Sequence, residues 1–303
     1  MSASRRSNTI TTLWAITAVI SLGLIITSFI PGVRTLLILL QVAFALLHGA
    51  HRYGWRAIGV FIGAGLVISN ILENLSIQTG FPFGHYHYTG SGKIFQVPWF
   101  IGPAYLATGY LAWVVATVLL GDVRRNSPWL TTIGTPVIAA FAMTAWDLSL
   151  DPSASTVHQA WIWQNSGGFF GVPLGNFLGW TFTVYLFVQV FALYLRGRGP
   201  LPTAEPDLAS DLQGVLLYGL TTVSFFVTFF TGDRKDVTDA VGNNTWRTGD
   251  IYETSALVTV YGMFFFAVLA LLRIAQQRTP APTPATSVKA TERAEPDELR
   301  PSV

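Results

Sequence analysis

Two aspartates four residues apart, Asp147 and Asp151, have the clearest chemical use in this sequence. Their spacing places both carboxyl groups on one face of a helix if the helix runs that far, although Pro152 makes its continuation unfavourable. A carboxyl group in apolar surroundings beside a like-charged neighbour tends to stay protonated, and a protonated carboxyl can donate a proton. The same spacing is as typical of aspartates that bond neighbouring helices or cap a loop. The pair is therefore a candidate proton donor, with a structural role as the alternative.

Glu73 is a third acid with a functional interpretation, because it lies inside a hydrophobic run of the sequence. A charged side chain in a membrane helix costs roughly 2.5–3.5 kcal/mol on insertion scales. We therefore expect Glu73 and Asp147 to be buried in protein or to lie beside a water-filled cavity. Asn70, three residues before Glu73, shares its helix face.

Aromatic rings are concentrated at residues 80–90 (GFPFGHYHYTG), between two hydrophobic runs. A loop that only connects membrane helices needs a few polar turn residues, so this segment predicts an aromatic surface where a ligand is bound or transformed. Trp161 and Trp163 either line the same pocket or belong to the interfacial aromatic belt, to which we assign Trp99 and Trp180. Asn176 is a candidate polar contact.

The composition indicates that membrane helices carry these residues. Of 303 residues, 51% are hydrophobic and only 11% are charged. Each helical crossing needs about 20 apolar residues. The sequence predicts an all-α polytopic membrane protein with about eight transmembrane helices, at residues 12–30, 33–50, 57–78, 98–120, 130–149, 173–195, 211–232 and 254–274. Residues 1–278 form this helical domain, and residues 279–303 are expected to be a disordered cytoplasmic tail, because apolar residues are too scarce there to build a core.

The basic residues predict the orientation of the chain. If eight helices alternate, five pairs of arginines fall on one side, which should be cytoplasmic, so that both termini lie inside. The acids and His85 then fall toward the outer side, although Arg234, Lys235 and Arg247 weigh against this topology near the last spans. The five pairs are Arg5/Arg6, Arg52/Arg56, Arg124/Arg125, Arg196/Arg198 and Arg273/Arg278.

Several classes of protein are excluded by composition. The chain has no cysteine, so it has no disulfide, thiolate metal site or thiol nucleophile. Its net charge is +2 and no basic stripe stands clear of the membrane ends, which argues against a nucleic-acid partner. His48 and His51 have the spacing of a histidine box, but the other three histidines lie on the far side, so we interpret both as interfacial or helix-capping residues.

A magnesium-dependent membrane prenyltransferase is the main alternative. Its aspartate-rich motifs hold magnesium and a prenyl diphosphate, and Asp147 with Asp151 and the run from Asp233 to Asp239 could be such motifs. The loop after Asp151 lacks the Lys or Arg that would grip phosphate, whereas Arg234 and Lys235 keep the alternative open. The second run is also typical of a solvated loop.

The sequence resembles the carotenoid-biosynthesis membrane family that contains the CruF-type carotenoid hydratases. The resemblance covers about residues 45–195. It is carried by residues 80–84 (GFPFG) with Tyr86 and Tyr88, residues 145–152 (AWDLSLDP), residues 161–163 (WIW), residues 171–173 (GVP) and residues 176–180 (NFLGW).

The resemblance implies addition of water to the terminal isopropylidene double bond of an acyclic carotenoid end, which gives a tertiary alcohol without a redox cofactor or a metal. Asp147 or Asp151 would protonate the alkene, and Glu73 or His85 would assist the attacking water. Ring faces would stabilise the carbocation. The residues expected to bind the substrate are Phe81, Phe83, Tyr86, Tyr88, Trp146, Trp161, Trp163 and Asn176.

The same resemblance places the protein in the cell membrane as a multi-pass protein, in contact with lipid, water, a carotenoid substrate and possible partners among other carotenoid-pathway enzymes. A carotenoid is a long apolar rod whose end must meet both lipid and water, and the outer mouth of the bundle offers both. A non-enzymatic pigment-binding or transport protein is a further alternative. Transport is disfavoured because the sequence has no evident inverted repeat.

Overall fold

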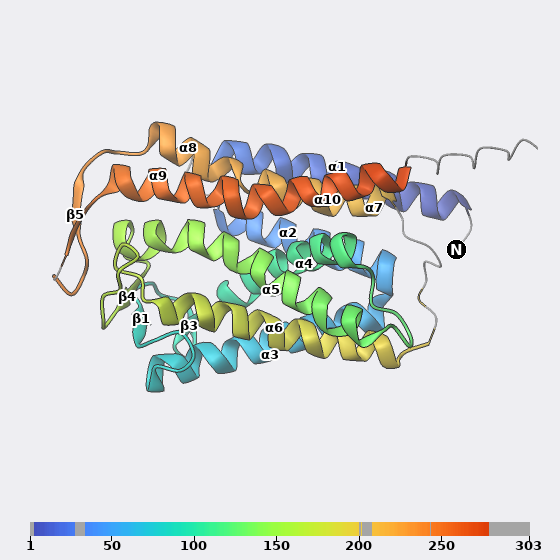
Figure 1. Cartoon of the computed structure of the whole chain (residues 1–303), viewed down its shortest axis with the longest axis horizontal. Helices are drawn as coiled ribbons and strands as arrows, with labels where there is room; N and C mark the ends of the chain where they lie inside the picture. The colour runs from blue at the N-terminus through green and yellow to red at the C-terminus, as the bar shows by residue number, and fades with distance from the viewer. Residues whose placement is uncertain (1–2, 28–33, 200, 202–207, 243, 279–303) are drawn as a thin grey trace, which may run out of the picture.

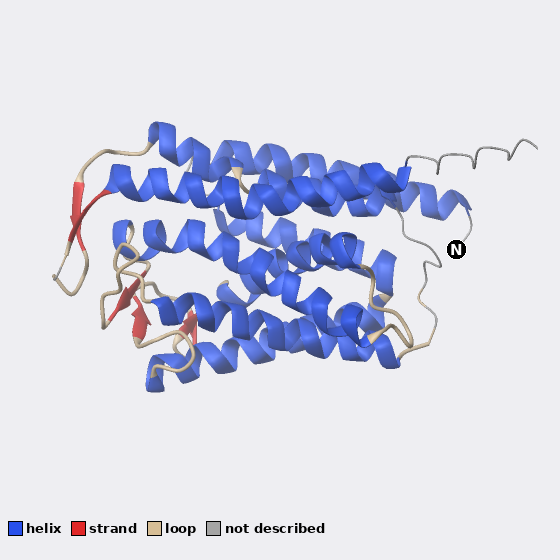
Figure 2. Cartoon of the chain, viewed as in Figure 1, coloured by secondary structure: helices blue, strands red, loops and turns tan. Residues whose placement is uncertain are grey.

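The chain folds almost entirely into helices, as the computed structural model shows for residues 3–27, 34–199, 201, 208–242 and 244–278 (Figures 1 and 2). The expected disordered tail, residues 279–303, lies outside the described residues. The helices are α1 (Ala3–Thr27), α2 (Arg34–Tyr53), α3 (Trp55–Thr79), α4 (Ile101–Leu120), α5 (Trp129–Asp151), α6 (Leu174–Gly197), α7 (Leu208–Leu220), α8 (Val223–Thr231), α9 (Thr248–Val258) and α10 (Phe265–Arg278), with π-helical segments η2 (Pro152–Val157) and η3 (Thr259–Phe264).

Six continuous helical stretches within the described residues are long and apolar enough to cross a membrane. They confirm the prediction of an all-α polytopic membrane protein. The first two of the eight expected spans, which correspond to α1 and α2, are not among the six, so the count of eight stays a prediction. The six stretches are Trp55–Thr79, Ile101–Leu120, Trp129–Val157, Leu174–Gly197, Leu208–Thr231 and Thr248–Arg278.

Helix α4 is the central helix of the bundle. It contacts α2, α3, α5, α6, α7 and α10, and Tyr105, Tyr110 and Trp113 on it are fully buried. Small residues let the helices approach closely, since a side chain at Gly109 would meet the ring of Phe187 and the sulfur of Met143. The helices that carry Glu73 (α3) and the aspartate pair (α5) are therefore held against a common support.

The helix that carries the aspartates continues past Pro152, so the expectation that this proline stops it is wrong. Helix α5 passes directly into η2, which begins at Pro152, and the helical stretch runs to Val157. A proline lacks an N–H donor and crowds the preceding turn, and the wider turn of a π-helix accommodates both. Asp147 and Asp151 consequently share one helix face.

Three short antiparallel strand pairs lie at one end of the bundle, where the sequence predicted only loops. Strand β1 (Tyr86–Tyr88) pairs with β4 (Trp161–Trp163), so that Tyr86 is opposite Trp163. Tyr86 and Tyr88 are buried while His87 between them is exposed, as the alternation of a strand requires. The other pairs are β2 (Lys93–Ile94) with β3 (Val97–Pro98), and β5 (Asp236–Thr238) with β6 (Thr245–Arg247).

The basic helix ends lie at the end of the bundle opposite to these strands. The connections α2–α3 and α4–α5 and the C-terminal ends of α6 and α10 are all on that side (Figure 1). Arg52, Arg124, Arg196 and Arg278 are therefore near one end, in agreement with the pattern used to predict orientation. Which end faces the cytoplasm stays a prediction.

Candidate active site

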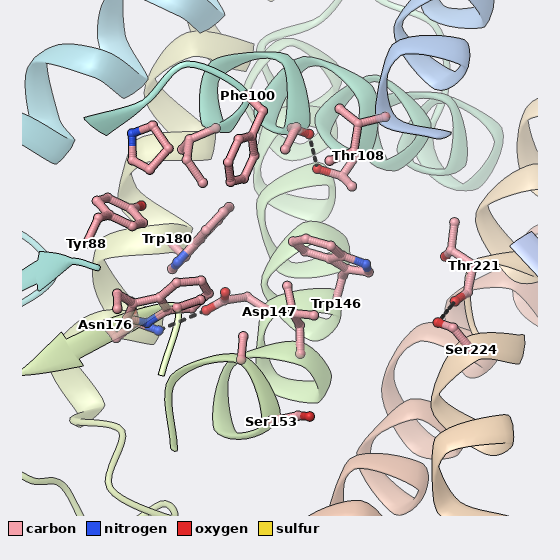
Figure 3. Close-up of a pocket in the computed structure, with 18 of the residues that line it drawn as sticks. Tyr88, Phe100, Thr108, Trp146, Asp147, Ser153, Asn176, Trp180, Thr221 and Ser224 are labelled. Carbon is pink, nitrogen blue, oxygen red and sulfur yellow. Dashed lines mark hydrogen bonds between the residues drawn. The ribbon is translucent and has the colours of Figure 1, made fainter. Parts of the chain in front are cut away.

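A cavity of about 490 Å³ opens among the helices at the end that carries β1 and β4. Its walls come from α1, α2, α3, α4, α5, α6, α8 and α9, together with η2, β1, β3 and β4, and Figure 3 shows some of the lining side chains. A volume of this size is typical of a pocket that binds a small ligand or one end of a longer one. The site predicted from sequence lies largely along its walls.

Asn176 joins the two aspartates. Its side-chain amide nitrogen donates to Asp147 Oδ2 at 2.9 Å (Figure 3) and also to Asp151 Oδ2. All three residues are at least 97% buried, and they meet because Asn176 lies in the first turn of α6, which packs along α5. Asp147 lines the cavity. Asp151 lies one helical turn after Asp147 and does not line the cavity.

Glu73 is held by three tyrosine hydroxyl groups. Tyr86 and Tyr88 both donate to Oε2, the latter at 3.0 Å, and Tyr105 donates to Oε1 at 2.8 Å. Glu73 is 2% exposed and lines the cavity. Three neutral donors satisfy the carboxylate without a cation, so the buried acid is retained by hydrogen bonding alone.

The phenols of the strand β1 remain neutral donors. Burial raises the pKa of Tyr86 and of Tyr88 well above the ordinary value, and the neighbouring Glu73 carboxylate raises both further. A phenolate beside a carboxylate in this apolar setting would be repelled. Both hydroxyl groups therefore stay protonated across the physiological range and continue to donate to Glu73.

None of these acids forms an ion pair with a Lys, Arg or His among the described residues. Lys93, the lysine or arginine closest in sequence to β1, donates to the backbone oxygen of Tyr88 at 2.6 Å. Asp151 Oδ1 is buried without a well-aligned hydrogen bond. A group of acids without a balancing cation is most stable when some of its members carry protons, which suits proton donation.

Aromatic rings enclose the acids. Tyr86 packs on Trp163 with ring centroids 4.9 Å apart, and Tyr88 packs edge-on to Trp161 at 5.9 Å. The register of β1 and β4 makes these contacts, because it sets each tyrosine opposite a tryptophan. Trp161 and Trp163 thus line the pocket, and the pocket interpretation of these residues is the one that the structure supports.

Phe83 reaches the cavity because α6 has glycine where the loop crosses it. A Cβ atom at Gly179 would lie 2.6 Å from Phe83 Cδ1 and 2.9 Å from the Pro82 backbone oxygen. Phe83 is 1% exposed and lines the cavity. The glycine spacing on α6 therefore positions one of the predicted rings.

Besides Asp151, which is joined to the cavity-lining Asp147 through Asn176, two of the predicted residues lie outside the cavity. Phe81 is 56% exposed and packs on Phe182 of α6. The His85 imidazole lies over Gly80, where an added Cβ would be 2.8 Å from the ring. The structure brings together Glu73, Phe83, Tyr86, Tyr88, Trp146, Asp147, Asp151, Trp161, Trp163 and Asn176, but it does not add Phe81 or His85 to them.

Tyr105 and Trp180 belong to the site but were not among the residues predicted to form it. Tyr105 bonds Glu73 and stacks on Trp180, with ring centroids 4.3 Å apart and planes 9° from parallel. Trp180, assigned above to the interfacial belt, lines the cavity instead. Its position four residues after Asn176, on the same helix face, was the available signal.

The second aspartate run lies apart from these acids. Asp233 and Asp236 are exposed, and Asp239 accepts a hydrogen bond from Ser166 at 2.7 Å at the β5–β6 hairpin. Within the described part of the chain, no group of three or more His, Asp or Glu residues is arranged to hold a metal ion. The two aspartate runs therefore do not form the shared cluster that the prenyltransferase alternative needs.

Comparison with known proteins gives one match. The model of a family described as "carotenoid biosynthesis protein" matches residues 33–233. This range includes α3, which carries Glu73, and α5, which carries Asp147 and Asp151. The chain belongs to this family. Membership of the carotenoid biosynthesis family confirms the resemblance drawn from the motifs and supports a role in carotenoid biosynthesis. No curated protein and no solved structure matches the chain.

Proposed function

We propose that this protein is a carotenoid hydratase of the cell membrane that adds water to the terminal isopropylidene double bond of an acyclic carotenoid end. One observation carries the proposal: Asp147, which lines an aromatic cavity, shares the Asn176 amide with Asp151, and neither aspartate forms an ion pair with a cation among the described residues. Hydration of an unactivated alkene needs a strong, poorly solvated acid, and this arrangement supports one.

Proton transfer comes first. Asp147 is the donor because it lines the cavity, and its carboxyl proton goes to the CH carbon of the double bond while the π electrons form the new C–H bond. The positive charge is left on the carbon that bears the two methyl groups. Asp147 becomes a carboxylate, and Asn176 continues to donate to it at the 2.9 Å contact.

Addition of water completes the reaction. A water oxygen bonds to the cationic carbon, and one of its protons passes to the carboxylate pair, which restores the acid. The product is a tertiary alcohol, and no electrons are gained or lost overall. Glu73, held by its three tyrosines, lies along the same cavity and keeps the local potential negative, which favours the cation.

The cavity also suits the shape of the substrate. Leu37, Ile38 and Phe225, from α2 and α8, also line the cavity, so the apolar chain behind the reacting end would meet apolar side chains. The remainder of the carotenoid would extend into the surrounding lipid. Water would enter from the end of the bundle that carries the strands.

Pigment analysis by mass spectrometry tests the proposal. The chain is expressed in cells that make an acyclic carotenoid but cannot modify it, and the expected result is a mass gain of one water. Asp236→Asn, at an exposed position on β5, is the control for Asp147→Asn. A gain of an isoprenoid unit would point to a prenyltransferase, and unchanged pigment with confirmed membrane expression would point to a carrier. Either result would overturn the proposal.

A further inference from the structure

Trp180 has one ring face covered and lines the cavity. Tyr105 stacks on it nearly parallel, at 4.3 Å and 9°, and Tyr105 itself is fully buried and does not line the cavity. Trp180 therefore separates Tyr105 from the cavity. Its remaining surface is bordered by Trp146 and Phe83, which both approach edge-on with centroids 6.3 Å away.

The ring lies next to the acid that faces the cavity. Trp180 is four residues after Asn176 on α6, so the two side chains stand one above the other on one helix face. Asn176 holds Asp147, and Figure 3 shows Trp180 beside these two residues, with Trp146 on the other side of Asp147. A cation formed by proton transfer from Asp147 is thus generated close to the indole.

The stacked pair is also connected to a negative charge. Tyr105 donates its hydroxyl proton to Glu73 Oε1 at 2.8 Å. Hydrogen bonding to a carboxylate polarises the phenol, whose ring lies parallel to the indole. Glu73 on α3, Tyr105 on α4 and Trp180 on α6 form a continuous chain across three helices.

We propose that the cavity-facing side of Trp180 is the binding surface for the positively charged end of the isoprenoid, and that Tyr105 is a positioning residue that orients and polarises it. The inference deepens the proposed function and rests on it for the identity of the cation. It replaces the wider set of rings named from sequence by one. Among the aromatic side chains, indole gives the strongest attraction to a cation.

Binding of a cation mimic tests the inference without catalysis. The probe is an acyclic isoprenoid that ends in a trimethylammonium group, and its neutral partner ends in a tert-butyl group of the same shape. Affinities of both for the full chain in detergent give a preference ratio. We expect Trp180→Leu to lower that ratio about tenfold and Trp180→Phe to lower it less, because a desolvated cation–π contact contributes on that order.

Controls separate the ring from other causes. Trp55→Leu, at a 64% exposed tryptophan on the opposite end of the bundle, should leave the ratio unchanged. Tyr105→Phe keeps the stack but removes the donor to Glu73, so it should lower the ratio slightly, whereas Tyr105→Leu should lower it more. An unchanged affinity for the neutral probe shows that a variant is folded.

The outcomes are distinct. If Trp180→Leu keeps the wild-type ratio while Asp147→Asn loses it, the carboxyl groups alone hold the cation and the inference is wrong. If the ratio falls as expected but cells expressing the wild type show no hydrated pigment, the cation surface stands and the hydratase proposal fails. If hydration occurs and all ring variants keep the ratio, the hydratase proposal stands without this surface.

Discussion

At the end of the bundle that carries the strands, three buried carboxyl groups are held by neutral donors, whereas at the opposite end Arg52 is paired with two aspartates. Arg52 lies 2.9 Å from Asp122 and 2.9 Å from Asp211, and Tyr53 donates to Asp122 at 3.0 Å. This ion-paired cluster joins α2, the α4–α5 connection and α7. The acid group of the cavity has no such partner among the described residues.

The two groups differ in how much their buried charges contribute to the stability of the fold. A buried ion pair whose partners are all present holds helices in register, and removal of one partner leaves an uncompensated charge. Buried acids without a cation contribute little to stability, and such groups are retained at sites of chemistry. We therefore expect the cluster around Arg52 to contribute to the stability of the fold and the cluster around Asp147 to contribute to the reaction.

The largest expected effect is at the reactive end. Asp147→Asn should lower product formation by about 10²–10⁴-fold, because it removes the proton donor while the amide keeps the shape of the side chain. Product is measured per amount of inserted protein. Asp236→Asn should retain full activity, and a fully active Asp147→Asn would break the assignment.

The matching change at the stable end acts on folding. Arg52→Met should lower the free energy of unfolding by about 3–5 kcal/mol, because the buried Asp122 and Asp211 both lose their 2.9 Å contact with the Arg52 guanidinium. Denaturation in detergent measures the loss. The triple variant with Asp122→Asn and Asp211→Asn should recover much of it, and stability equal to wild type in Arg52→Met would contradict the comparison.

The same change, aspartate to asparagine, can be compared in the two clusters. Asp211→Asn should lower the free energy of unfolding by about 1.5–3 kcal/mol, since it removes a charged partner of Arg52. Asp147→Asn should change it by less than about 1 kcal/mol, because this carboxyl has no cation to lose. The same denaturation assay compares them, and equal losses would show that both ends serve stability.

A smaller effect is expected where α6 positions Phe83. Gly179→Ala should push the loop and its ring from the cavity at a cost of about 1–3 kcal/mol, which should appear as weaker substrate binding. The dependence of product on substrate concentration measures it. Gly59→Ala is the matched control, because a Cβ there meets nothing within 4 Å, and equal effects would remove the role of Gly179.

The smallest effect is expected at His85. Its ring lies over Gly80 and outside the cavity, so His85→Ala should change activity by less than about twofold, as for surface substitutions. Activity at saturating substrate is sufficient to measure this. A loss of 100-fold or more would restore His85 as the base that the sequence suggested.

Much of the architecture follows from residue type alone. Runs of about 20 apolar residues predict membrane helices because each backbone polar group must be satisfied within the membrane, and six helical stretches meet the combined criteria of length and apolar composition within the described residues. The prediction that Pro152 ends the helix was wrong because a π-helical turn accommodates the proline. Formation of that turn depends on the packing around η2. The pairing of β1 with β4 was missed because it joins segments more than 70 residues apart in the chain, and the two local hairpins were missed because their strands have only two or three residues each.

Hydropathy and motifs, which are properties of the chain, were enough to predict a membrane protein of carotenoid biosynthesis and to single out its acids, rings and amide. Which of these side chains meet could be read only from the folded structure. In the fold, Asn176 donates to both aspartates and three tyrosines donate to Glu73. Trp180 lines the cavity, whereas His85 does not. The physical reason is that helix packing and strand register, which depend on contacts between segments far apart in the chain, set the direction of each side chain.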